Sequence, residues 1–150
     1  MSIGTPCKTV ELHITVGDDD LPEDRYSRHV NNARYFVFIN RAFHAWYVKM
    51  GLRNADAPFG PVMAHTAYDF LRQVNPPGEV VCRITTSKVG RTSLEHSVEM
   101  WDHSQNPPLL AGRGRVVHVW INRATGQSQA WPADVLSKCW NEASAQTPSD

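Results

Sequence analysis

Hydrophobic and polar residues alternate at the start of the chain and then change to a helical spacing. In residues 9–16 single polar residues separate the apolar ones, which predicts a half-buried strand. From residue 32 to about residue 50 the apolar positions cover most of a helical circumference. This pattern predicts one long helix that is buried on most sides. Gly51 follows this segment and is a common residue at a helix end.

Four more segments with the character of strands follow the predicted helix. They span residues 61–71, 79–87, 92–101 and 110–121, and turn-forming residues separate them. A short helix is predicted over residues 133–140, and the polar residues 141–150 are expected to be disordered. The order predicts an α+β fold, in which an antiparallel sheet of five or six strands wraps around one long central helix. The exposed face and edges of such a sheet favour pairing with further subunits, as a homodimer or homotetramer.

The composition fits one globular domain over residues 1–150 and excludes several classes of function. Fifteen basic residues balance fifteen acidic ones, so no overall field favours a nucleic acid or a membrane as partner. Three widely spaced cysteines and the absence of a secretory signal in the sequence suit a cytoplasmic location. The seven histidines have no ligand-like spacing beside the cysteines, so no metal is predicted.

The segment His29–Phe36 reads HVNNARYF. It resembles the HVNNxxY signature that opens the central helix in the 4-hydroxybenzoyl-CoA thioesterase-like branch of the hotdog superfamily, and plant acyl-ACP thioesterases carry a similar element. The resemblance covers residues 8–132 approximately, which it implies are the core of the fold. It implies an enzyme that hydrolyses an acyl-CoA or acyl-ACP thioester to a free acid and a thiol. No cofactor is implied beyond the coenzyme A or phosphopantetheine of the substrate.

The chemistry of this motif follows from the start of a helix. Asn31 or Asn32 is a good N-cap, since its side chain can accept a hydrogen bond from the free N–H groups of the first turn. These N–H groups and the positive end of the helix dipole can stabilise a carbonyl oxygen that becomes an oxyanion. His29 either orients the thioester or the carboxylate, or is a structural hydrogen-bonding residue.

The carboxylate that the family uses is not at its usual place. The family has an acidic residue four positions before the motif histidine, in a pattern like DxDxxGH, but that position is Arg25 here and the usual glycine is Arg28. Aligned from the preceding strand, Gly17–Asp20 resembles the family's GDxD, which makes Asp20 the catalytic residue and implies an insertion of roughly five residues in an exposed loop. Alternatively, a one-residue adjustment of the loop brings Asp24 into the site.

Two further classes of function stay open. If the loop aspartates are only solvated charges, the chain is either a non-hydrolytic acyl-thioester binding or pathway accessory protein on the same fold, or hydrolyses the thioester through another group. A hydratase is a weaker alternative, because the motif is of the thioesterase type. Relatives with a catalytic acid on the central helix offer no other route, since the corresponding positions are Asn40 and Arg41.

Candidate substrate-binding residues lie in three segments. Tyr35 and Phe36 help to shape an acyl pocket that favours a hydrophobic or aryl group. His65 shares a strand face with Asp69, and the two either line a cleft beside the helix, are structural polar groups with satisfied hydrogen bonds, or lie on an exposed face. The hairpin residues with phosphate-binding chemistry, which are otherwise a solvated hairpin tip, are Lys88, Gly90, Arg91 and Thr92.

Overall fold

The computed structural model describes residues 8–24 and 27–140 of the 150-residue chain. The predicted disordered tail 141–150 and Arg25 lie outside the described residues. The elements are β1 (Thr9–Val16), a 3₁₀ helix (Asp18–Asp20), α1 (Asn32–Met50), β2 (Phe59–Phe70), β3 (Gly78–Val89), β4 (Ser93–Asp102), β5 (Leu109–Asn122) and α2 (Ala133–Cys139).

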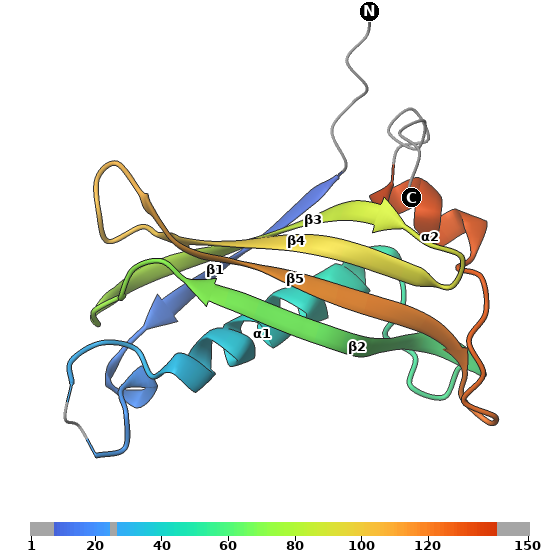
Figure 1. Ribbon diagram of the computed structural model, residues 1–150, viewed down its shortest axis with the longest axis horizontal. Helices are drawn as coiled ribbons and strands as arrows, with labels where there is room; N and C mark the ends of the chain where they lie inside the picture. The colour runs from blue at the N-terminus through green and yellow to red at the C-terminus, as the bar shows by residue number, and fades with distance from the viewer. Residues whose placement is uncertain (1–7, 25–26, 141–150) are drawn as a thin grey trace, which may run out of the picture.

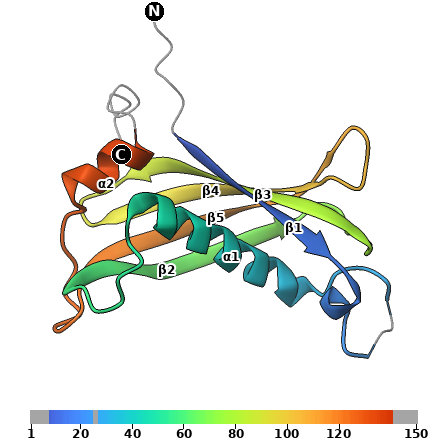
Figure 2. The same ribbon diagram turned by 180° about the vertical axis from the view of Figure 1, so that it is seen from behind.

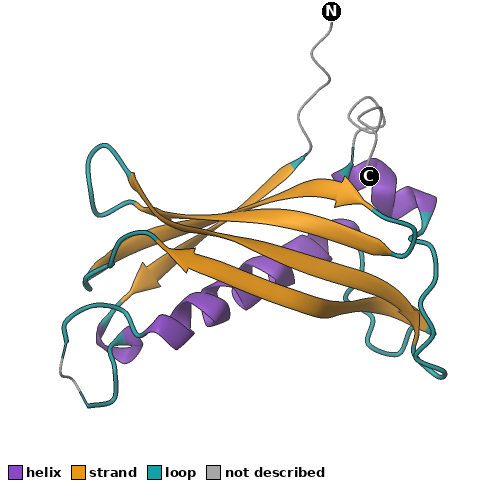
Figure 3. Ribbon diagram, viewed as in Figure 1, coloured by secondary structure: helices purple, strands orange, loops and turns teal. Residues whose placement is uncertain are grey.

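The five strands form one antiparallel sheet in the order β1-β3-β4-β5-β2, and α1 lies across one of its faces (Figures 1 and 2). Both the α+β class and the antiparallel sheet are confirmed, with five strands. The chain crosses from one edge of the sheet to the other between β1 and β2, and α1 makes this crossing. The three consecutive strands β3, β4 and β5 fill the middle of the sheet (Figure 3).

Helix α1 begins at a side-chain cap and ends at a glycine. The Oδ1 atom of Asn31 accepts a hydrogen bond from the N–H of Ala33, and Gly51 has a left-handed φ of 74° that closes the last turn. One side of α1 is buried against the sheet, whereas Asn40, Arg41 and other residues of the opposite side are exposed. The prediction of burial on most sides is therefore wrong for a single chain. Neither helix in residues 8–24 and 27–140 combines the length and apolar character that a membrane span needs.

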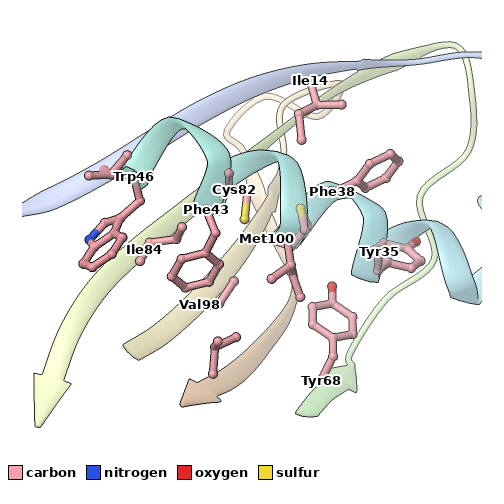
Figure 4. Packing of buried hydrophobic residues seen from close by; sticks show 14 of the residues in the cluster. Ile14, Tyr35, Phe38, Phe43, Trp46, Tyr68, Cys82, Ile84, Val98 and Met100 are labelled. Carbon is pink, nitrogen blue, oxygen red and sulfur yellow. The ribbon is translucent and has the colours of Figure 1, made fainter. Parts of the chain in front are cut away.

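The core fills the space between α1 and the sheet. Phe38 and Phe43 of the helix point toward apolar residues of the strands, among them Ile84, Val98 and Met100 (Figure 4). At the edge of the core β5 carries Gly112, because a Cβ atom there would collide with the hydroxyl of Tyr68 on β2. The alternating glycines of β5 thus serve close packing of two strands.

Two histidines are part of this core. His96 and His118 are fully buried and pack against the rings of Phe43 and Trp46, with centroid separations of 4.7–5.8 Å. His118 Nε2 lies 2.6 Å from the hydroxyl of Tyr47, and His96 Nδ1 lies 3.1 Å from that of Thr86. The Nε2 atom of His96 has no hydrogen-bond partner among the residues described here.

Burial lowers the pKa of His96 to about 3, with a further lowering from His118, and lowers the pKa of His118 to about 4. Both histidines have an ordinary pKa of 6.5. In the unfolded chain they therefore bind protons at a higher pH than in the folded protein. Their contribution to stability is complete above the unfolded pKa and is lost as the pH falls from there toward the folded values.

We expect the free energy of unfolding to decrease between about pH 7 and pH 5, by about 2 kcal/mol per buried histidine at pH 5. Urea unfolding monitored by tryptophan fluorescence at several pH values measures this slope. His96→Phe is expected to reduce the slope by about half, while the exposed control His44→Gln leaves it unchanged. If His96→Phe leaves the slope unchanged, the buried His96 is not a source of the pH dependence.

Candidate active site

The carboxylate of Asp20 is buried beside the start of α1. The 3₁₀ helix after β1 turns the chain so that Asp20 is only 6% exposed, whereas its neighbours Asp18 and Asp19 are exposed. The Gly17 N–H donates to Asp20 Oδ2 at 2.9 Å. The Asn31 N–H donates to the carbonyl of Asp20 at 2.8 Å, which attaches this turn to the beginning of the helix. Asp20, one of the two predicted candidates, is therefore fixed at the start of α1.

Arg34 supplies the second partner of this carboxylate. Its Nε atom donates to Asp20 Oδ1 at 2.8 Å, and the Arg34 side chain is about one-third exposed while that of Asp20 is 8% exposed. We did not predict a role for Arg34 from the sequence. The available signal was a lone cation in the first turn of a helix, where the dipole disfavours positive charge unless an acidic group lies close.

Among the described residues, the first turn of α1 has one backbone donor without an acceptor. The Ala33 N–H is occupied by Asn31 Oδ1, and the Arg34 N–H donates to the Asn31 carbonyl. The Asn32 N–H has no acceptor within the described part of the chain. Asn31 is therefore the N-cap of the two predicted candidates, and the backbone of Asn32 provides a donor that a carbonyl oxygen can use.

An aromatic cluster lies beside the same end of α1. The ring of Tyr35 stacks on Tyr68 at 5.3 Å, and Phe70 contacts both rings. Phe36 contacts Tyr68 and is 37% exposed, so of the two predicted acyl-pocket residues it is the one open to a ligand, since Tyr35 is buried. The Tyr68 hydroxyl is buried without a partner among the described residues, and burial raises its pKa far above the ordinary value.

The 71–77 connection holds this aromatic cluster against the helix start. The Val30 N–H donates to the Val74 carbonyl at 2.8 Å, and the Val74 N–H donates to the Tyr35 hydroxyl at 3.4 Å. Two remaining motif candidates lie in the adjoining loop: His29 is half-buried and Asp24 is exposed. The 3₁₀ helix and this connection therefore both attach to the chain just before α1.

Other predicted substrate-binding residues lie elsewhere. His65 and Asp69 do share a face of β2, but it is the face opposite α1, where His65 is opposite Val117 of β5. The expectation of a cleft beside the helix is therefore wrong, and the alternative of an exposed face is correct.

The β3–β4 hairpin is at the opposite end of the sheet from Asp20 (Figure 1). Val16 of β1 pairs with Gly78, where β3 begins, and Lys88 is ten residues further along β3. At the usual rise of a strand this separation is about 30 Å. Within one chain, Lys88, Gly90, Arg91 and Thr92 therefore do not contact an acyl group at Asp20. The Thr92 carbonyl accepts hydrogen bonds from the backbone of Trp120 and the ring of Trp131.

The described residues contain no group of three or more histidine, cysteine, aspartate or glutamate side chains that could hold a metal ion. The site at the start of α1 therefore consists of a carboxylate, a guanidinium, a backbone donor and aromatic rings. These groups suit attack on a polarised carbonyl.

An antiparallel five-stranded sheet with one helix across a face is the architecture of the hotdog class. Residues 14–139 match the thioesterase-like superfamily, and the chain therefore belongs to that superfamily.

The chain is also similar to individual proteins and solved structures. The chain is 26% identical over 103 residues to the uncharacterized protein YsmA of Bacillus subtilis (strain 168), covering 69% of this chain and 68% of that one. It is similar in structure to the PA2801 protein of Pseudomonas aeruginosa, with a TM-score of 0.77, 26% identity and coverage of 85% and 95%. A 4-hydroxybenzoyl CoA thioesterase complexed with 4-hydroxybenzoyl CoA has the same fold at 14% identity, with a TM-score of 0.74 and coverage of 87% and 98%.

The identity of the residue that caps α1 can be tested through the stability of two variants. We expect Asn31→Ala to lower the free energy of unfolding by about 1 kcal/mol, because the Ala33 N–H loses its acceptor. Asn32→Ala removes an exposed side chain from the next position and is expected to change stability by less than about 0.5 kcal/mol. Urea unfolding of the two variants checks this, and equal losses would refute Asn31 as the cap.

Proposed function

We propose that this protein hydrolyses an acyl thioester of coenzyme A or of an acyl carrier protein, with Asp20 as the catalytic carboxylate. The observation that carries the proposal is the position of this buried carboxylate beside the open first turn of α1. Membership of the thioesterase-like superfamily supports thioester hydrolysis in general.

In this proposal the thioester carbonyl oxygen accepts a hydrogen bond from the Asn32 N–H. In the first of two routes, an oxygen of Asp20 bonds to the carbonyl carbon, the carbon–sulfur bond breaks to release the thiolate, and water then hydrolyses the acyl anhydride to the free acid and the Asp20 carboxylate. In the second route, Asp20 removes a proton from a water molecule that attacks the carbonyl carbon. The water oxygen bonds to the carbonyl carbon, the carbon–sulfur bond breaks, and the proton held by Asp20 passes to the departing thiolate. An oxyanion donor of this kind is worth about 3 kcal/mol in the transition state.

The acyl group that best fits the site is hydrophobic or aromatic. Phe36 and Phe70 are exposed and both contact the buried ring of Tyr68, so they present apolar, aromatic surface to which another aromatic ring can pack. The thioesterase of the same fold that was solved with 4-hydroxybenzoyl CoA is an example of an aryl substrate in this class. We propose that Phe36 contacts the acyl group, and that His29 orients the thioester.

A non-hydrolytic binding function is the second candidate. Both oxygens of the Asp20 carboxylate already accept a hydrogen bond, one from Gly17 and one from Arg34. These two bonds occupy about half of the hydrogen-bonding sites of the carboxylate, as a purely structural role of Asp20 would also require. A binding protein would keep the pocket and the Asn32 donor without turnover.

Lys88 and Arg91 stay predicted ligands of the phosphates of the substrate's carrier. This role requires the carrier to extend from the start of α1 toward the far end of the sheet, because the hairpin is about 30 Å from the Asp20 end. Both side chains are exposed and cationic, as phosphate ligands need to be.

The catalytic proposal is tested by thiol release, followed with a disulfide colour reagent, on aliphatic and aromatic acyl-CoA and acyl-ACP thioesters. We expect Asp20→Asn to lower kcat by about 100-fold or more, the usual effect of losing a general base. The matched controls Asp18→Asn and Asp24→Asn remove exposed carboxylates from the same segment and are expected to retain activity.

Each alternative has its own result in this assay. Activity that survives in Asp20→Asn but is lost in Asp24→Asn would transfer the catalytic role to Asp24. Saturable binding of a thioester by the folded wild type without thiol release would favour the binding function. A changed acyl chain with an intact thioester would indicate a hydratase.

We also propose that the protein is a homo-oligomer that associates through the free edge of β2. This strand pairs with β5 on one side only, and it carries exposed apolar side chains at Phe59, Val62 and Phe70. A long unpaired edge with apolar residues favours pairing with another strand.

Light scattering coupled to size-exclusion chromatography is expected to give at least twice the chain mass of 16.9 kDa. A proline at an edge position removes a ladder hydrogen bond, so Val62→Pro is expected to lower the mass toward that of one chain. An exposed residue of the opposite edge strand, changed as Thr9→Pro, is the control. A wild type with the mass of one chain would contradict the proposal.

A further inference from the structure

Arg34 is fixed between the core and the Asp20 carboxylate. Its guanidinium carbon is 5.7 Å from the centroid of the Phe38 ring, which is fully buried one turn further along α1. Its Nε atom donates to Asp20 Oδ1 at 2.8 Å. The ring limits the positions that the guanidinium can take, so Arg34 is a rigid partner for the carboxylate.

The carboxylate of Asp20 is consequently held at two points from two different elements. Oδ2 accepts from Gly17 at the end of β1, and Oδ1 accepts from Arg34 in the first turn of α1. A single hydrogen bond would leave the carboxylate free to rotate about its Cβ–Cγ bond. The second bond sets the plane of the carboxylate relative to the helix start, and hence the direction of its remaining lone pairs.

Arg34 also places a positive charge next to a cluster of acidic residues. Asp18 and Asp19 precede it in the same 3₁₀ helix, and the first turn of α1 contains no acidic residue. Arg34 is the group that forms an ion pair with Asp20 among the described residues. Its positive charge lies beside the three consecutive carboxylates of the 3₁₀ helix and offsets part of their negative charge.

We propose that Arg34 is a positioning residue of the hydrolysis, which acts through Asp20 and does not touch the thioester. The role rests on the proposed function. It predicts that loss of Arg34 slows the chemical step while substrate binding changes little, because a nucleophile or base displaced by about 1 Å can cost about 100-fold in rate. A planar guanidinium suits both the Phe38 ring and the Nε hydrogen bond, so lysine is not an equivalent replacement.

The test compares Arg34→Gln and Arg34→Lys with Arg41→Gln, which removes the same charge from an exposed position of the same helix. Thiol release gives kcat and KM, and urea unfolding reports whether each variant is folded. We expect kcat to fall about 10- to 100-fold in both Arg34 variants, with KM within about 3-fold of the wild type. Arg41→Gln is expected to keep both constants within about 2-fold.

A double substitution separates positioning from a purely structural role. In an Asp20→Asn background, Arg34→Gln is expected to change the residual rate by less than about 3-fold, since residues that act as a unit are not additive. An equal loss in both backgrounds, or a wild-type kcat in folded Arg34→Gln, would overturn the role while the proposed hydrolysis stands. A folded wild type without thiol release on any thioester would overturn both.

Discussion

The packing of α1 across the sheet is the constraint on which the rest of this structure depends. Its apolar side must lie over the middle strands, and this fixes the direction of the helix from one edge strand to the other. The polar start of α1 then emerges next to the end of β1, where the chain has just left the sheet. The 3₁₀ helix bridges this gap, so that Asp20 contacts the backbone of Asn31. The position of the carboxylate is thus a consequence of how the core is buried.

Periodicity predicted the elements well because each one has a single burial pattern. The strand of residues 9–16 and the helix from residue 32 to residue 50 agree with β1 and α1, since alternation and capping signals act locally. The register of β1 also indicated Asp20 as a candidate. Arg34 escaped prediction because its partner is fourteen residues earlier and on another element.

The predicted positions of His65 and of the β3–β4 hairpin differ from the structure because they depend on how the strands pair. The register of β2 shifts between Met63 and His65. Met63 pairs with the buried His118, and the shift turns the side chain of His65 to the other face of the sheet. The residue types in this stretch of the sequence do not predict a β-bulge. The position of the β3–β4 hairpin, by contrast, follows from strand direction: β3 begins beside the end of β1 and runs away from it. The length of β3 then carries Lys88 to the far end.

The buried carboxylate has to satisfy both folding and chemistry. Asp20 loses most of its hydration in the folded protein, so its oxygens need partners, and Gly17 and Arg34 supply one each. An ionised carboxylate has about four lone-pair sites, and these two bonds leave about half of them unused. Partners that stabilise the fold therefore do not exclude an approaching carbonyl or water. The two partners set the orientation of the unused lone pairs of Asp20. Arg34 does so from the same helix whose first turn carries the Asn32 N–H donor.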